Sequence, residues 1–427
     1  LPTDMMKNGL GMPNANLQDL EFLRFNSQNT FVKDMWKNCY AGISRANTAI
    51  AKIPEIKMNE SKKNRLIAEA RTLRALYYFN LVRFFGDVPL ILDLKTVEDS
   101  KGPRDSKELI YDQIIEDLTF AEEHLPLRSE YSASDEGRIN KGAAKILFGK
   151  VYLTKGDFQK AKDKLAEVVE HESEYGFGLH KDYHANWLRD TEAGIEAVLY
   201  IEYKEPPFQH NGEMALAGPK YSIPGSLGIS ALNEADIPTQ ELYDQFDNRD
   251  LRKKTNFKTE FAHLKTGEIL KSSIPLSGKF WVEGLETGDR CDVNMHIIRY
   301  ADAILMYAEA LNEVGESTKA LAMLNRIRER AFGDDSGNFK PMSKDEFRTA
   351  ILNERRLEFP HEGHRWFDLV RTGTFIQRMK EHSAYEAKVA EANKTEIAQN
   401  IKEHMILMPI PQSEIDLNPN LVQNAGY

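Results

Sequence analysis

Acidic side chains at helical spacing are the first residues of this sequence to suggest chemistry. Glu354 and Glu358 are four residues apart in one helical pattern, so both carboxylates lie on the same helix face. Carboxylate pairs can hydrolyse glycosidic bonds, but such pairs normally come from different elements that flank the scissile bond. Because Arg355, Arg356 and Arg365 are close in the sequence, we interpret the glutamates as members of a structural ion-pair network.

Three segments contain residues that bind metals, and none has a specific metal-binding pattern. The HEGH sequence at 361–364 is not the HExxH zinc motif, because its histidines are three residues apart. His180 and His184 have helical metal-ligand spacing, but two histidines alone are weak evidence. The turn Glu286–Asp292 is acidic enough for calcium, although a solvated turn is the more common structure. We expect no catalytic residue, metal or cofactor, with bound calcium as an open alternative.

The composition is typical of a folded protein with an acidic surface. The 427 residues include 56 Lys and Arg against 66 Asp and Glu, which gives a net charge of −10. This balance disfavours nucleic acids and anionic membrane surfaces as partners, because both require a basic footprint. No run of about eighteen apolar residues predicts a membrane span. The sequence has no GxSxG, P-loop or dinucleotide fingerprint, so common hydrolases, kinases and dehydrogenases have no support.

Helices are expected to position these residues. The stretch Asn59–Pro89 is the clearest helix, because Asn59 can cap its start and the Gly86–Pro89 segment ends it. Its C-terminal half is apolar nearly all round, so it needs neighbours on several sides. Further helices are predicted over about Phe31–Ile53, Asp105–Leu125, Ser343–Phe359, Arg365–Arg371 and most of 380–403.

Two segments resemble the tetratricopeptide repeat, a unit of two packed helices. Residues 148–169 and 307–330 share its pattern of small, apolar and turn residues. Gly156 and Gly315 stand at the turn between the two helices, and Ala161 is small enough to let the second helix approach the first. The sequence therefore predicts a scaffold of helical hairpins over residues 30–171 and 296–371.

The region between these repeats has a different character. Residues 172–295 include one predicted buried strand, Ala197–Ile201, and a stretch rich in Gly, Pro, aromatic and amide residues. Long ordered loops are functional more often than not. Prolines exclude helix from most of residues 404–427, which are expected to form an extended tail packed on the scaffold. The predicted fold class is mainly α, with a tetratricopeptide-like helical-hairpin scaffold, a large irregular loop-rich insertion and little strand, in one domain over 1–427.

Four motifs occur in an order and spacing typical of one family. They run from Ala68 to Pro89, from Arg299 to Ala310, from Glu354 to Arg371 and from Pro409 to Tyr427. On these motifs the chain resembles the SusD/RagB family, the nutrient-binding lipoproteins of the outer membrane of Bacteroidetes. Residues 204–295 match that family only in general style. The family's signal peptide and lipid-bearing cysteine are not in this sequence, and we expect them to have been trimmed from a longer precursor.

The resemblance implies a single SusD-like domain that catalyses no reaction. Such a protein binds an oligosaccharide or polysaccharide at the cell surface and delivers it to a SusC-like TonB-dependent transporter, in nutrient uptake and polysaccharide utilisation. Its membrane association, on the extracellular face of the outer membrane, comes from a lipid anchor that is absent from this chain. Two alternatives remain open: a tetratricopeptide-type protein–protein adaptor and an α-helical glycoside hydrolase.

Sugar binding requires flat aromatic rings together with amides or carboxylates that reach hydroxyl groups. Trp281, in an irregular segment, is the first candidate for a stacking platform, whereas Trp36, Trp187 and Trp366 are expected to pack in the interior. The Pro/Gly-rich stretch adds Phe208, His210, Asn211 and Tyr221. The resemblance implies further contacts from loops before the first long helix, where the candidates are Asn14, Asn16, Phe25, Asn26 and Gln28.

Overall fold

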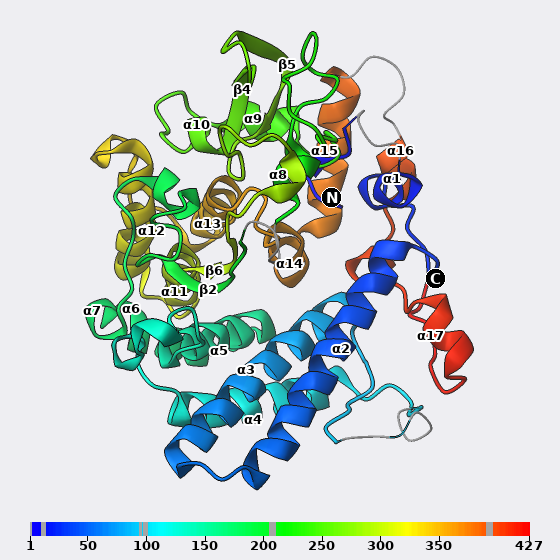
Figure 1. Ribbon diagram of the computed structural model, residues 1–427, viewed down its shortest axis with the longest axis vertical. Coiled ribbons are helices and arrows are strands. Elements are labelled where there is room, and N and C mark those ends of the chain that lie inside the picture. The colour runs from blue at the N-terminus through cyan, green and yellow to red at the C-terminus, as the bar shows by residue number, and fades with distance from the viewer. Residues whose placement is uncertain (1, 10–13, 94–95, 97–100, 205–210, 390–395) are drawn as a thin grey trace. The chain divides into compact units, whose positions relative to one another are not determined.

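The computed structural model describes residues 2–9, 14–93, 96, 101–204, 211–389 and 396–427, and it is mainly helical with few, short strands (Figure 1). The predicted fold class is confirmed in this respect. The contacts divide the chain into two compact units. Unit 1 comprises residues 1–23 and 177–401, and unit 2 comprises residues 24–176 and 402–427. The prediction of a single domain is not tested by this division.

Unit 2 consists of consecutive helices that pack on their neighbours in the chain. Helix α3 lies between α2 and α4, and α5 packs against both α4 and α6 (Figure 1). The helices are α2 (Thr30–Lys52), α3 (Glu60–Phe85), α4 (Lys107–His124), α5 (Lys141–Lys155), α6 (Phe158–Val169), α7 (Glu172–Tyr175) and α17 (Gln412–Leu417), with 3-10 helices η1 (Ile53–Glu55), η2 (Arg128–Glu130), η3 (Ala133–Asp135) and η7 (Glu403–Ile406).

Helix α3 begins and ends where the sequence predicts. The Asn59 side chain accepts hydrogen bonds from the first turn, and Gly86 ends the helix with a φ of 72°. The C-terminal half is buried among neighbours, because α2 approaches closely at Gly42. A Cβ atom at that glycine would lie 2.3 Å from the ring of Tyr77. Trp36 is buried as predicted and contacts the Phe85 ring edge-on, with 5.0 Å between the ring centroids.

The C-terminal residues pack on the end of α3 within unit 2. The Met408 amide donates to the Phe84 carbonyl oxygen over 2.6 Å, and the Asn424 amide group donates to the Phe85 carbonyl oxygen over 3.0 Å. The prediction that residues 404–427 form an extended tail is wrong in one respect, because this segment contains α17. Pro411 precedes that helix at its N-cap position, where a missing N–H leaves no helical hydrogen bond unmade.

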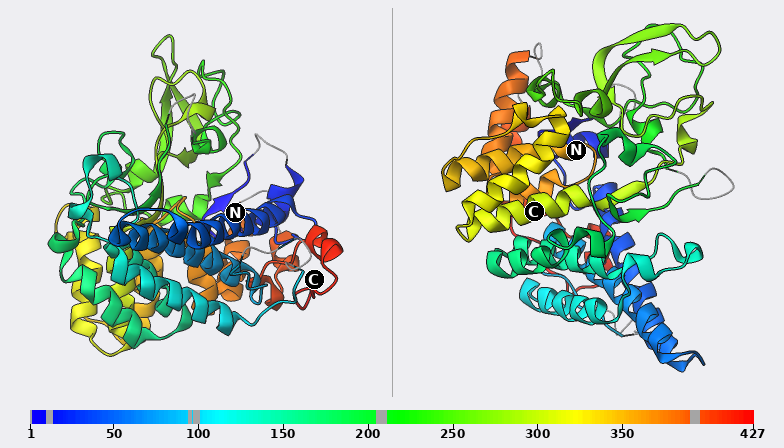
Figure 2. Two further views of the ribbon diagram at one scale, coloured as in Figure 1. Left: turned by 60° about the horizontal axis from the view of Figure 1, so that its bottom comes forward. Right: turned by 90° about the vertical axis from the view of Figure 1, so that its left-hand side faces the viewer.

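Both predicted helical hairpins are present. In unit 2, α5 and α6 meet at Gly156, whose φ is 79°, and a Cβ atom at Gly149 would lie 2.5 Å from Leu165. In unit 1, α11 and α12 lie side by side (Figure 2) and are joined at Gly315, whose φ is 90°. The assignment of these hairpins to the tetratricopeptide class stays a prediction.

Within its described residues, unit 1 combines the remaining helices with three two-stranded antiparallel sheets, which pair β1 with β3, β2 with β6 and β4 with β5. The strands are β1 (Met6–Lys7), β2 (Ala197–Ile201), β3 (Ile237–Pro238), β4 (Phe257–Ala262), β5 (Ile269–Ser277) and β6 (Met295–Arg299). The helices are α1 (Ala15–Glu21), α8 (Glu213–Ala217), α9 (Gln240–Gln245), α10 (Lys253–Asn256), α11 (Tyr300–Glu313), α12 (Ser317–Phe332), α13 (Lys344–Glu358), α14 (Arg365–Arg371), α15 (Phe375–Val389) and α16 (Glu396–Asn400), with 3-10 helices η4 (Tyr183–Trp187), η5 (Gly288–Arg290) and η6 (Asp335–Gly337).

The insertion at 172–295 is more regular than the sequence predicts. Strand β2 occupies the predicted residues, but the β4–β5 hairpin and the short helices α8, α9 and α10 were not expected. The hairpin was missed because much of β4 and the first part of β5 are exposed, so neither shows a strong apolar pattern. Its turn contains Gly267 with a φ of 71°.

A buried ion-pair network occupies the interior of unit 1. The Glu358 carboxylate lies 2.9 Å from Arg252 Nη1, 2.9 Å from Arg299 Nη1 and 2.6 Å from Arg330 Nη2, and none of the four side chains is more than 5% exposed. Burial raises the pKa of Glu358, but the three guanidinium groups outweigh it and hold that pKa well below its usual range. Glu358 is therefore a charged residue at the centre of a compensated cluster.

The structural ion-pair interpretation of Glu354 and Glu358 is confirmed, but the predicted partners are wrong. Glu354 pairs with Arg252 and Arg328 rather than with arginines near it in the sequence. Those nearby arginines bind other carboxylates: Arg355 pairs with Asp302 and Asp368, whereas Arg356 and Arg365 pair with Asp4. Ion pairing in this unit is thus mostly long-range in sequence.

No helix among the described residues combines the length and the apolar character that crossing a lipid bilayer requires.

Replacing Glu358 with glutamine should destabilise the protein strongly. The substitution keeps the side-chain volume but leaves Arg252, Arg299 and Arg330 without their shared anion, and removing one partner of a buried ion pair costs about 3–5 kcal/mol. Urea unfolding followed by circular dichroism measures this loss. Glu260→Gln is the matched control, because Glu260 pairs with Lys271 on the surface, and it should change the free energy of unfolding by less than about 1 kcal/mol. Equal losses in the two variants would contradict the central role of Glu358.

Candidate functional site

The predicted stacking residue Trp281 lies between two apolar clusters of unit 1. It packs against both while remaining partly exposed. Its ring meets Phe261 edge-on, with 4.7 Å between centroids, and Lys258 Nζ lies 5.7 Å from its ring centroid. The clusters comprise Tyr183, Trp187, Met214, Phe280, Cys291 and Val293, and Ile223, Leu227, Leu232, Ile237, Phe261 and Leu276. Trp281 thus has a packing role, and its contact with a ligand stays a prediction.

Asn211 is buried and its amide is used within the protein. The side-chain nitrogen donates to the Val293 carbonyl oxygen over 2.9 Å, and the side-chain oxygen accepts from the Glu213 amide over 2.8 Å. The Asn211 amide donates to the Cys291 carbonyl oxygen over 2.6 Å. These bonds fix the start of α8 against the segment that leads to β6. The role of Asn211 that these bonds support is therefore to position α8 rather than to bind a ligand.

Tyr221 is the most exposed aromatic residue among the candidates that the structure describes, with 59% of its surface accessible. Its loop is held by the buried carboxylate of Glu234, which accepts from the amides of Lys220 and Tyr221 at 2.8 Å and of Ser222 at 3.0 Å. Ile223, two residues further on, belongs to a cluster against which Trp281 packs. A rigid backbone therefore presents the Tyr221 ring to solvent. The role of Glu234 has no signal in the local sequence.

The remaining candidates have varied environments. Asn14 caps α1 through hydrogen bonds from the amides of Asn16 and Leu17, and Asn16 is partly buried on that helix. Phe25 is buried and stacks on Tyr427, with 6.1 Å between ring centroids, so it contributes to packing. Asn26 and Gln28 are exposed, and the Asn26 side chain accepts from the Gln28 amide. Asn14 and Asn16 belong to unit 1, and the other three residues belong to unit 2. Phe208 and His210 lie outside the described residues.

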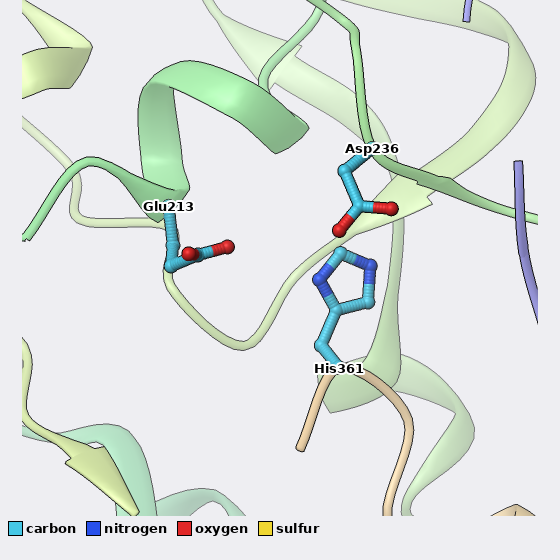
Figure 3. A group of neighbouring side chains, drawn as sticks. All are labelled: Glu213, Asp236 and His361. Carbon is cyan, nitrogen blue, oxygen red and sulfur yellow. The ribbon is translucent and has the colours of Figure 1, made fainter. Parts of the chain in front are cut away.

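Three side chains of types that can bind a metal come together in unit 1. The sequence analysis did not predict that they are neighbours. The potential ligand atoms of Glu213, Asp236 and His361 all lie within 4.8 Å of one another. Figure 3 shows the His361 ring below the Asp236 carboxylate and to one side of the Glu213 carboxylate; Glu213 comes from α8 and Asp236 from the loop before β3. Burial, followed by the charge of Asp236, raises the pKa of Glu213 to about 7. Burial also lowers the pKa of His361 to about 4, so its imidazole is neutral near pH 7.

Apart from His361, the metal-like segments noted in the sequence contribute no side chain to such a three-ligand group in the described part of the chain. The acidic turn is held instead by an ion pair from Asp292 to Arg189 at 2.7 Å and by a bond from the Ser230 amide to the Glu286 carbonyl oxygen. At His180, the backbone amide donates to Glu196. Calcium binding at the turn therefore gains no support from the positions of these side chains.

Two family models match this chain. The one described as the SusD family matches residues 276–427, and the one described as starch-binding associating with outer membrane matches residues 2–153. A relative, SusD-like protein P2 from Formosa agariphila, is 31% identical, and the match covers 93% of this chain and 81% of that protein. The chain therefore belongs to the SusD family.

Solved structures agree with this assignment. A SusD superfamily protein from Parabacteroides distasonis is 27% identical, with a TM-score of 0.84, and the match covers 100% of this chain and 92% of that one. A protein described as a laminarin-binding SusD-like protein is also 27% identical, with a TM-score of 0.81 and coverage of 100% and 93%. The names of these proteins and of the matching family models describe glycan binding or family membership, in agreement with the non-enzymatic prediction.

Replacing Glu234 with alanine should loosen the Tyr221 loop. Three backbone amides would lose a buried charged acceptor, which costs about 1–3 kcal/mol of stability. Amide hydrogen exchange at residues 220–222 should become faster, whereas exchange in α11 should keep its relative protection. Glu268→Ala, at an exposed position of the β4–β5 turn, is the control. Unchanged exchange at 220–222 in the Glu234 variant would show that this carboxylate does not hold the loop.

Proposed function

We propose that this protein captures a glycan at the outer face of the outer membrane and passes it to a SusC-like TonB-dependent transporter. The observation that carries the proposal is the exposed ring of Tyr221 on a loop fixed by Glu234, in a chain of the SusD family. A flat aromatic ring facing solvent suits the C–H face of a pyranose, and stacking of this kind tolerates many sugars. The laminarin-binding relative supports a glycan as the ligand.

The cellular location proposed here follows the family. One matching family model is described as associating with the outer membrane, and a lipid anchor in the precursor would hold the protein there. The acidic net charge of −10 favours a neutral ligand over nucleic acid or an anionic surface. Because Glu354 and Glu358 are locked in ion pairs, they do not provide the free acid and base of a glycoside hydrolase.

Retardation in native gels that contain laminarin, starch or other polysaccharides tests glycan binding. We expect retardation by at least one glycan without release of reducing ends. Tyr221→Ala should weaken that binding about 3- to 10-fold, since an aromatic contact contributes about 0.5–1.5 kcal/mol. Tyr221→Phe, which keeps the ring, should bind as the unchanged protein does.

Three results would count against glycan capture. Release of reducing ends would favour the hydrolase alternative. No retardation across the panel, together with capture of a peptide, would favour the adaptor. Equal binding by the Ala and Phe variants would remove Tyr221 from the site. Trp281→Ala is less decisive, because loss of its packing between two clusters would destabilise the fold as well.

Delivery to a transporter is tested separately. Affinity capture of the lipid-anchored protein from outer membranes of the source organism, followed by mass spectrometry, should recover a TonB-dependent barrel in roughly equal amount. A monomeric protein recovered without a barrel, but still able to bind glycan, would contradict delivery and leave glycan capture intact.

A further inference from the structure

The partly buried cluster of Glu213, Asp236 and His361 differs from the ion pairs in the interior of unit 1. Among the described residues, no hydrogen bond or ion pair joins any of these three side chains to another residue, whereas the Glu358 carboxylate has three arginine partners. Asp236 Oδ1 and His361 Nε2 are sealed from solvent and receive no hydrogen bond within the described ranges. Buried polar atoms without a partner are costly, and each one requires an explanation.

Two carboxyl groups and one imidazole meet here, and no cationic side chain among the described residues forms an ion pair with them. The ammonium group of Lys279 acts on His361, but its Nζ is bound to Glu362 at 2.6 Å. A cation that bound here would satisfy both Asp236 Oδ1 and His361 Nε2.

All three side chains come from anchored backbone. Glu213 is the first residue of α8, and its backbone amide donates a hydrogen bond to the Asn211 side-chain oxygen. The amides of Ala235 and Asp236 both donate to the Leu216 carbonyl oxygen, which ties the Asp236 loop to the same helix. His361 has a φ of 62° and is followed by Glu362, which is fixed by Arg299 and Lys279. Ligands held in this way lose little conformational freedom on binding an ion.

We propose that Glu213, Asp236 and His361 bind one Zn²⁺ ion. Imidazole nitrogen with carboxylate oxygen is a ligand set that suits zinc, whereas calcium and magnesium prefer oxygen ligands alone. The ligand atoms of a tetrahedral zinc ion are about 3.4 Å apart. Side-chain rotations would therefore have to bring together the atoms of Glu213, Asp236 and His361, which now lie within 4.8 Å of one another. Three protein ligands leave at least one position for water.

The proposed ion would join the insertion to the segment after α13. Residue His361 is far from Glu213 and Asp236 in the sequence, so the ion cross-links a long loop of unit 1, and binding energy gained in the folded state adds to stability. This inference does not depend on glycan binding, and its test does not use a glycan.

The test is equilibrium dialysis of the intact chain, first stripped with EDTA, against micromolar Zn²⁺, with bound metal measured by mass spectrometry. We expect one Zn²⁺ per chain and a higher melting temperature with Zn²⁺ than with EDTA. Glu213→Gln, Asp236→Asn and His361→Asn should each weaken Zn²⁺ binding at least tenfold and abolish the melting shift. Asparagine is chosen at 361 because it tolerates a positive φ.

Glu286→Gln, in the exposed acidic turn, is the matched control and should bind Zn²⁺ as the unchanged protein does. Circular dichroism verifies the fold of each variant, and Co²⁺ replacing Zn²⁺ should give visible absorption bands that disappear in the three ligand variants. The proposal is overturned if less than about a tenth of the chains bind Zn²⁺, if the folded ligand variants bind it undiminished, or if millimolar Ca²⁺ displaces it.

Discussion

A carboxylate surrounded by three guanidinium groups is the interaction on which unit 1 depends. Glu358 ends α13, and its partners come from the segment before α10, from the end of β6 and from α12. Burying such charges is unfavourable unless every partner arrives with suitable geometry. These elements must therefore assemble together, and apolar packing alone would not define their positions. Glu362, held by Arg299 and Lys279, extends the same network to the residue beside His361.

The helical part of the fold could be predicted because its signals are local. Asn59 and Gly86 mark the ends of α3 through hydrogen bonds and a positive φ that involve only nearby residues. The same holds for the capping box of Ser343 and Glu346 at the start of α13. The β4–β5 hairpin could not be predicted in this way, because its half-exposed strands depend on pairing and packing that the local sequence does not encode.

The candidate site was less predictable, because residue type does not determine exposure. Asn211 and Phe25 have side chains of the types found in sugar-binding sites. The Asn211 side chain, however, forms hydrogen bonds within the protein, and the Phe25 ring packs against Tyr427. Glu234 was missed, since a loop anchor 12–14 residues from its partners has no sequence pattern. The cluster of Glu213, Asp236 and His361 was missed for the same reason: its residues come from separate segments and meet only in the fold.

The residue that anchors the Tyr221 loop differs from the residue that we propose to contact the glycan. Glu234 binds main-chain amides, so the loop keeps its shape whatever side chain stands at position 221. That side chain faces water, and exchanging it for another residue has little effect on stability. Under the proposed function, a lineage could therefore change its preferred ligand by single substitutions at the tip of this loop, without first acquiring compensating changes in the core.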